Sequence, residues 1–171
     1  PVELEKGFLL SGHVYDLNTN ALSGGYIEVY YSNTWTRLNV DTMVGVDGSY
    51  SALVPGATLR VTAQNFPGYI NQVYSNHYMW EWDEGPVYDP VTVTADVSGI
   101  DFYLEPVAQI SGNVQGGGSP LEGSHVAAFV TTWNTGGWQD VTWIMDTFTD
   151  VSGDYTLDVP PGTNYHVEAR G

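Results

Sequence analysis

An internal repeat is the feature that most constrains the fold of this chain. Five short motifs occur twice, in the same order, about 100 residues apart. They pair Ser11-Gly12-His13-Val14 with Ser111-Gly112-Asn113-Val114, Ala21–Gly24 with Pro120–Gly123, Asp47–Tyr50 with Ser152–Tyr155, Val54–Gly56 with Val159–Gly162, and Val61–Ala63 with Val167–Ala169. Because motifs repeated in order mark successive copies of one structural unit, the sequence predicts tandem modules.

The phase of the repeat sets the expected domain boundaries. The pair Leu4-Glu5 precedes the first Ser-Gly motif by the same distance as Leu104-Glu105 precedes the second. Residues 1–8 are therefore expected to be the last strand of a preceding repeat. Residues 9–106 are expected to form a complete repeat, and residues 107–171 a second repeat that is incomplete at its C-terminal end.

Short alternating segments separated by turn residues indicate strands throughout. Gly25–Tyr31, for example, places Ile27 and Val29 on one face and Glu28 on the other. The other expected strands of the complete repeat are Phe8–Tyr15, Thr34–Asp41, Gly48–Leu53, Thr58–Gln64, Pro90–Ala95 and Gly99–Leu104. No segment has a helical period, so we predict an all-β fold of β-sandwich modules with about seven strands each.

The ordered motifs resemble the carboxypeptidase regulatory-like domain. The second repeat carries them as Ile110–Val114, Leu121-Glu122-Gly123, Asp150–Tyr155, Pro160-Pro161-Gly162 and Tyr165-His166-Val167. The resemblance implies a Greek-key, transthyretin-like (prealbumin-like) sandwich related to the Cna-B modules. It also implies a spacer, stalk or adhesive role in a secreted or cell-surface protein, although a fold does not fix a function.

Charge and composition exclude several classes of function. Asp and Glu number 20 against 4 Lys and Arg, and the net charge is −16. A chain so acidic is not expected to bind nucleic acid or adsorb to an anionic membrane, because both need clustered basic residues. With no cysteine, the chain has no disulfide or thiol chemistry, and no apolar run is long enough for membrane insertion.

One turn of the second repeat resembles a calcium loop. Asp150, Ser152 and Asp154 alternate along it, and Asp146 lies just upstream. Calcium prefers several oxygen ligands on a tight turn, so calcium is a possible cofactor. The competing interpretation is a hairpin turn in which an Asp caps the turn and Gly153 takes a positive φ.

Tryptophans suggest a second kind of site. Trp80 and Trp82 would share one face of a strand, while Trp133 and Trp138 flank a long loop. Exposed coplanar rings can stack on sugars, which would make a carbohydrate-binding surface with glycans as partners. The alternative is that the rings fill the core.

The leading hypothesis is a non-catalytic extracellular structural module: a stalk, a cell-surface layer or a filament-forming repeat. No nucleophile, base or metal set indicates an enzyme. Val2 and Leu4 of one copy could complete the second repeat of another copy by β-strand addition, so that the partners are copies of the chain. Two alternatives stay open: the chain is a piece of a longer array whose neighbouring modules are its partners, or it is a carbohydrate-binding accessory module of a secreted enzyme or adhesin.

Overall fold

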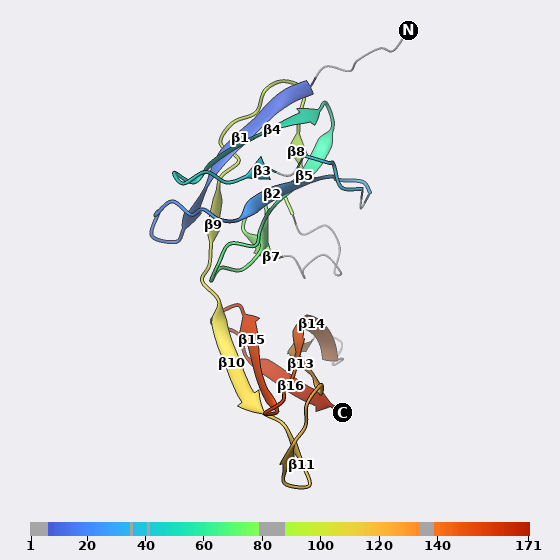
Figure 1. The fold of residues 1–171 in the computed structure, drawn as a ribbon. Helices are drawn as coiled ribbons and strands as arrows, with labels where there is room; N and C mark the ends of the chain where they lie inside the picture. Colours follow the sequence, from blue (N-terminus) through green and yellow to red (C-terminus); the bar gives the residue numbers. More distant parts are fainter. Residues whose placement is uncertain (1–6, 35, 41, 79–87, 134–138) are drawn as a thin grey trace. The chain divides into compact units, whose positions relative to one another are not determined.

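A computed structural model describes residues 7–34, 36–40, 42–78, 88–133 and 139–171 (Figure 1). All regular structure in these residues is β-strand, as the sequence predicts. No helix in the described residues is long and apolar enough to cross a membrane. The chain divides into two compact units, unit 1 (residues 1–106) and unit 2 (residues 107–171), and each is described by itself.

One sheet of unit 1 is centred on β1 (Gly7–Asp16). Strand β1 pairs antiparallel with β4 (Ser49–Pro55) at one edge. At the other edge it pairs parallel with β9 (Phe102–Leu104), which comes from the far end of the unit. The expected strands at 8–15, 48–53 and 99–104 thus form one sheet.

The second sheet of unit 1 is built on β2 (Tyr26–Tyr31) and β5 (Thr58–Gln64), which pair antiparallel. Shorter strands extend it: β3 (Thr42–Met43), β6 (Gln72–Val73), β7 (His77–Tyr78) and β8 (Val91–Thr92). In the described residues of the expected strand at 34–41, namely 34 and 36–40, the structure has no strand, only an isolated bridge from Arg37 to Tyr30. Leu38 and Val40 still pack against the core, so the apolar residues of this segment are held in place without a regular strand.

The two sheets of unit 1 enclose one hydrophobic core. Alternate residues of each strand point inward, and the fully buried ones include Leu10 and Val14 of β1, Ile27 and Val29 of β2, Leu59 and Val61 of β5, and Phe102 and Leu104 of β9. The closing strand β9 therefore contributes large side chains to the centre of the sandwich.

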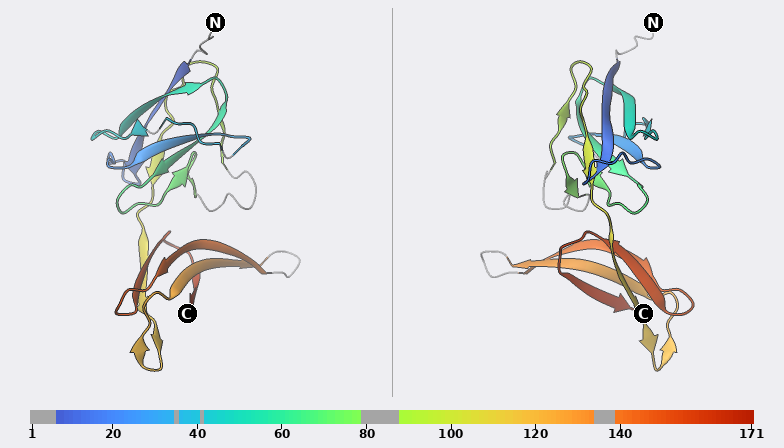
Figure 2. Two further views of the ribbon diagram at one scale, coloured as in Figure 1. Left: turned by 45° about the vertical axis from the view of Figure 1, so that its right-hand side comes forward. Right: turned by 90° about the vertical axis from the view of Figure 1, so that its left-hand side faces the viewer.

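Unit 2 repeats the pairing of unit 1. Strand β10 (Ala108–Asn113) pairs antiparallel with β15 (Asp154–Val159), as β1 pairs with β4. A second sheet has the order β14 (Gln139–Phe148), β13 (His125–Trp133), β16 (Tyr165–Arg170), and Figure 2 shows its curvature. Strands β11 (Gln115–Gly116) and β12 (Ser119–Pro120) form a separate hairpin. The core is small, with Val126, Ala128, Leu157 and Val159 fully buried.

Candidate functional site

Unit 1 is closed by its last segment, residues 97–104, and the candidate site of unit 2 lies at the corresponding edge. The closing segment of unit 1 runs along β1 and exchanges backbone hydrogen bonds with it. The Ser11 N–H donates to the Val97 carbonyl at 2.9 Å, and the Val97 N–H donates to the Leu9 carbonyl at 2.8 Å. The Ile100 N–H then donates to the Ser11 carbonyl at 3.1 Å. Residues 97–104 thus cover this edge of β1, with a bridge at Val97 and a regular strand at β9.

Two carboxylates complete the pairing where backbone groups do not reach. Asp96 Oδ1 accepts the Leu9 N–H at 2.9 Å, and Asp101 Oδ1 accepts the His13 N–H at 2.8 Å. Every second residue of β1 from Leu9 to His13 therefore has its N–H satisfied by the closing segment. An edge strand without such a neighbour presents these donors to any extended chain.

A glycine and a tyrosine hold the closing segment at its centre. Gly12 lies opposite Tyr50 in the register of β1 and β4. A Cβ on Gly12 would collide with the Ile100 carbonyl, so only glycine allows the close approach. The Tyr50 hydroxyl donates to that same carbonyl at 2.5 Å. Burial, followed by the charge of Asp101, raises the pKa of Tyr50, which keeps the hydroxyl a donor.

In unit 2 the corresponding edge is open. Among the described residues, β10 pairs with β15 alone, whereas β1 has a neighbour on both sides. Gln109, Ser111 and Asn113 occupy the positions of Leu9, Ser11 and His13, and all three are exposed. No described residue of unit 2 takes the place of residues 97–104.

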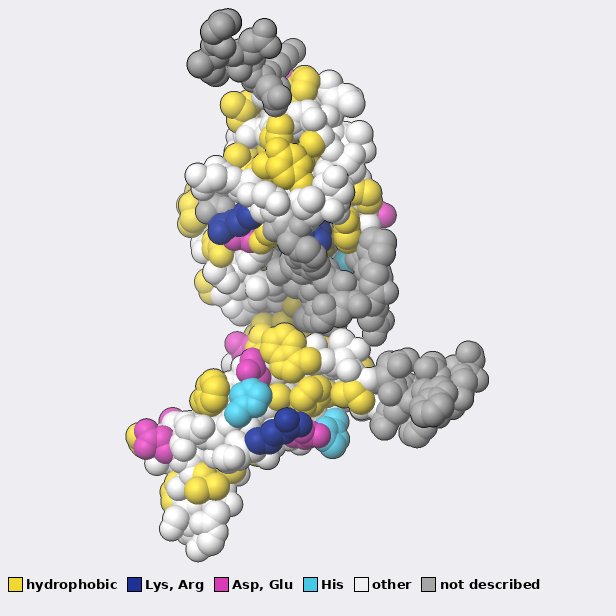
Figure 3. All heavy atoms as spheres, turned by 90° about the vertical axis from the view of Figure 1, so that its right-hand side faces the viewer, with side chains coloured by type: hydrophobic (Ala, Val, Ile, Leu, Met, Phe, Trp, Pro, Cys, Tyr) yellow, Lys and Arg dark blue, Asp and Glu magenta, His cyan; other side chains and the backbone are white. Residues whose placement is uncertain are grey.

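The core of unit 2 is correspondingly half-open. Ile110 and Val114 are only partly buried, although their counterparts Leu10 and Val14 are inaccessible to solvent. Ala169 is exposed where Ala63 is buried. Figure 3 shows another face of unit 2, where hydrophobic side chains lie among histidine, arginine and acidic side chains. The open edge and the partly buried side chains beside it are together what we call the β10 groove, defined by Ile110, Gly112, Val114 and Tyr155.

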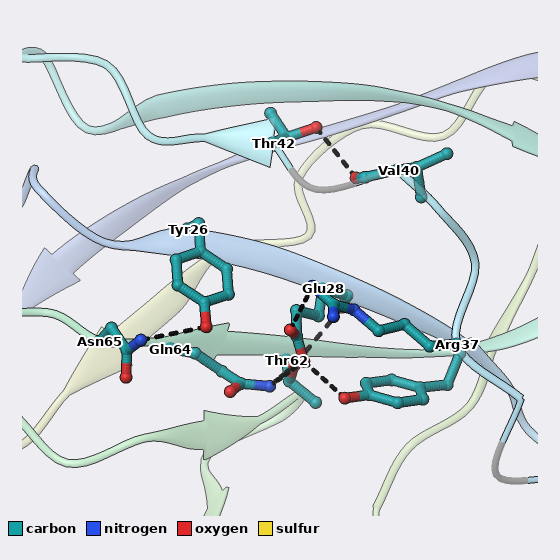
Figure 4. Close-up of polar contacts among 9 residues, drawn as sticks. Tyr26, Glu28, Arg37, Val40, Thr42, Thr62, Gln64 and Asn65 are labelled. Carbon is teal, nitrogen blue, oxygen red and sulfur yellow. Dashed lines mark hydrogen bonds and ion pairs between the residues drawn. The ribbon is translucent and has the colours of Figure 1, made fainter.

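A buried carboxylate is the main polar feature of unit 1 (Figure 4). Glu28 of β2 is 5% exposed and accepts from the Tyr30 hydroxyl at 2.5 Å and from the Gln64 side chain of β5. Arg37 forms an ion pair with Glu28 at 2.6 Å. Because the charge is paired and its oxygens are hydrogen-bonded, the network ties the segment around Arg37 to the sheet.

Arg60 lies on the same sheet, between two aromatic rings. Its guanidinium carbon is 5.1 Å from the centre of the Tyr30 ring and 5.3 Å from that of Tyr88. Burial lowers the pKa of Arg60, and the two tyrosines act in the opposite direction. The arrangement is a cation–π contact that attaches the segment at Tyr88 to β5.

An open hollow of about 640 Å³ lies over β1 and β4 of unit 1. Serine hydroxyls, His13 and Asp101 line it, and the Ser49 hydroxyl already donates to Asp47 at 2.7 Å. The aromatic ring at the hollow belongs to Tyr50, which is buried and engaged with Ile100. The hollow therefore offers no free ring on which a sugar could stack.

The structure shows the expected calcium loop as a tight turn. Asp150 Oδ1 accepts the N–H groups of Ser152 at 2.8 Å and Asp154 at 3.0 Å, and Gly153 has a φ of 75°. Asp146 is directed elsewhere, to His125 Nε2 at 2.6 Å. No cluster of three or more His, Cys, Asp or Glu in the described part of the chain could hold a metal ion. Calcium binding at this turn stays a prediction.

The other predicted site residues fall mostly outside the described residues. Trp80, Trp82 and Trp138 lie there, as do Val2 and Leu4. Trp133 ends β13, where only its backbone is described. Both the carbohydrate-binding surface and the strand-exchange residues therefore stay predictions.

Sequence reasoning identifies Gly12, Tyr50 and their counterparts as repeat markers but assigns them no site. The signal is available: glycine at the centre of an expected strand indicates close approach of another backbone. Glu28 falls on the polar face of its strand, and nothing in the local pattern indicates that Arg37 and Gln64 bury it.

Several solved structures resemble this chain at low sequence identity. No family model matches the chain, and no curated protein matches it. The Bacillus anthracis TIE protein is 15% identical, over 96% of this chain and 31% of that protein, with a TM-score of 0.40. A streptococcal ancillary pilin is 11% identical, over 96% of this chain and 59% of the pilin, with a TM-score of 0.41.

A DUF3823 family protein from Parabacteroides merdae is 15% identical, over 92% of this chain and 82% of that protein, with a TM-score of 0.35. The chain spans less than two thirds of the length of the anthrax protein and of the pilin. Likeness at this level does not carry function from one protein to another.

Proposed function

We propose that this chain is a non-catalytic structural module of an extracellular or cell-surface protein, of the carboxypeptidase regulatory-like kind, whose copies assemble head to tail by β-strand addition. The observation that carries the proposal is the open β10 edge of unit 2, next to a half-open core. In unit 1 the equivalent edge is paired and the equivalent core is closed.

The β10 edge also lacks the features that protect edge strands. Soluble proteins blunt exposed edges with charged residues, proline or a bulge. Residues 108–113 read Ala-Gln-Ile-Ser-Gly-Asn, with neither charge nor proline, and the register between β10 and β15 is unbroken. An unprotected edge beside apolar surface is suited to pairing with another strand.

Residues 1–6 of the next copy are the proposed added strand. Val2 and Leu4 correspond in the repeat to Phe102 and Leu104, whose side chains fill the core of unit 1. Each contact of this kind leaves a new open groove at the far end, so the assembly propagates as a filament. The net charge of −16 per copy opposes association at low ionic strength and is screened over about 8 Å at physiological salt.

Light scattering after size exclusion tests the proposal at low and physiological salt. The variant Val2→Asp with Leu4→Asp removes the apolar face of the arm and leaves β1 intact. Its matched control, Glu3→Ser with Glu5→Ser, alters the opposite face. We expect oligomers for the unaltered chain and the control, and monomers for the Asp variant and for a chain lacking residues 1–6. A monomeric unaltered chain at every salt and concentration would refute head-to-tail assembly and favour a covalently continuous array.

A further inference from the structure

Two large aromatic side chains are exposed on the outer face of the sheet formed by β13 and β14. Trp143 and Phe148 both belong to β14, and they are 51% and 65% exposed. Neither ring contributes to the buried core cluster of unit 2. Exposed aromatic rings are favoured at binding surfaces, because they offer a large apolar area at a small cost in conformational entropy.

The strand register arranges the residues around these rings. Three cross-strand pairs follow one another on this face: Phe148 with His125, Asp146 with Ala127, and Trp143 with Phe129. The first and last pairs are four residues apart on β13, a span of about 13 Å. The face thus has aromatic rings at both ends, and its middle holds one carboxylate and one small alanine.

Hydrogen-bonding groups lie between the two exposed rings. His125 Nε2 and Asp146 Oδ2 are 2.6 Å apart, and both side chains are partly exposed. Because Ala127 ends at its Cβ, it does not stand between these groups and solvent. A ligand lying across the face would therefore meet apolar rings at its ends and polar atoms in its middle.

Unit 1 shows that the same positions are exposed where the segments after β5 are present. In the register of β2, the counterparts of Phe148 and Trp143 are Met43 and Arg37. Both counterparts are exposed to solvent. The site is limited to β13 and β14, because Arg60, on the strand that corresponds to β16, is buried in unit 1.

The charges of this face favour a neutral ligand. Asp146 is paired with His125, and the net charge of −16 disfavours anionic polymers. No group of residues in the described ranges could hold a metal ion. A protein surface laid over the face would take the Asp–His pair out of water, and charged groups are depleted at the centres of protein interfaces for this reason.

We propose that the outer face of β13 and β14 binds a neutral oligosaccharide. The apolar faces of the sugar rings pack on Trp143 and Phe148, and sugar hydroxyls donate to the Asp146 carboxylate and bond with His125. The distance between the two rings exceeds the length of one sugar ring, so the ligand is a chain of at least two sugars. The site adds glycan attachment to the structural role of the module and does not depend on the β10 groove.

Affinity electrophoresis of the full chain under native conditions tests the inference. The gels contain one of four neutral polysaccharides: hydroxyethylcellulose, laminarin, arabinoxylan or galactomannan. We expect at least one of them to retard the chain, and the dependence on polysaccharide concentration gives the Kd. Trp143→Ala and Phe148→Ala each remove one ring and should raise this Kd about tenfold. Trp143→Phe keeps an aromatic ring and should raise it less than about threefold.

A matched control lies at the corresponding position of unit 1. Met43→Ala removes an exposed apolar side chain from the counterpart of Phe148, and should change the Kd less than about twofold. Asp146→Asn keeps the shape of the side chain and removes its charge, and should raise the Kd about fivefold. Circular dichroism checks that each variant is folded.

Failure of all four polysaccharides to retard the chain would overturn the inference, and so would equal retardation of the chain and its two alanine variants. Light scattering of Trp143→Ala separates the sugar site from a contact between copies. If this variant lost self-association and kept its retardation, the face would be a protein contact and the inference would be wrong. Head-to-tail assembly uses other residues, so either proposal can fail while the other stands.

Discussion

Substituting phenylalanine at Tyr50 and at Tyr155 compares the closed and the open unit with one chemical change. Tyr50 is 5% exposed, and its hydroxyl donates to the buried Ile100 carbonyl at 2.5 Å. Its removal loses the bond and leaves that carbonyl without this donor, at a cost of about 2 kcal/mol. The Tyr155 hydroxyl makes no such bond among the described residues, so Tyr155→Phe should change the stability of unit 2 by less than about 0.5 kcal/mol.

Hydrogen exchange resolved by peptide reports each unit separately, because β4 belongs to unit 1 and β15 to unit 2. We expect Tyr50→Phe to lower the free energy of opening at the slowest amides of β4 and to lower the melting temperature of unit 1 by about 10 °C. The amides of β15 should be unaffected by Tyr155→Phe. Equal losses at both sites would show that unit 2 already holds a closing strand, and no loss at Tyr50 would refute the role given to its hydroxyl.

Four further predictions concern single contacts. Gly12→Ala should destabilise unit 1 by about 3 kcal/mol or more, since its Cβ meets the Ile100 carbonyl, and urea denaturation measures this. Arg37→Met leaves the buried Glu28 carboxylate without its cation and should cost about 2 kcal/mol in the same assay. Because burial raises the pKa of Tyr50 in the folded state, unfolding releases its proton above about pH 10, so thermal scans should show unit 1 losing stability as pH rises through that range. Asp150→Ala removes the acceptor for two turn amides and should lower the melting temperature of unit 2; a rise on adding calcium that this variant abolishes would support the calcium site.

The strands that alternate cleanly in sequence were predicted best. Thr58–Gln64 was expected and found at the same bounds, since both of its faces are apolar or well paired. The expected strand at 90–95 shortens to Val91–Thr92, and the one at 34–41 is reduced, in its described residues, to a bridge at Arg37. In these segments, contacts with other parts of the chain decide whether a strand forms, and the local alternation of apolar and polar residues does not reveal those contacts.

The candidate site, too, could be predicted from the sequence only in part. The repeat in the sequence shows that Gly112 corresponds to Gly12. Position 12 must be glycine because the Ile100 carbonyl lies against it. Glu28 has the pattern of a solvent-facing residue, and its burial is compensated by the nearby Tyr30 hydroxyl together with Arg37 and Gln64. Ile100 and Gln64 are both distant in the sequence from the residues they contact, so no local pattern could have identified them.

The order of strands bears on the proposed assembly. Strand β9 ends at Leu104 and β10 begins at Ala108, so the strand that closes one unit leads directly into the first strand of the next. Leu4 and Gly7, where β1 begins, have nearly the same separation. Any repeat of this kind that supplies a closing strand to the β10 groove therefore also brings the first strand of a new unit. Under the proposed function, that unit is built in the same order, so filling one groove and extending the array would be a single event, whether the connection is covalent or made by strand addition.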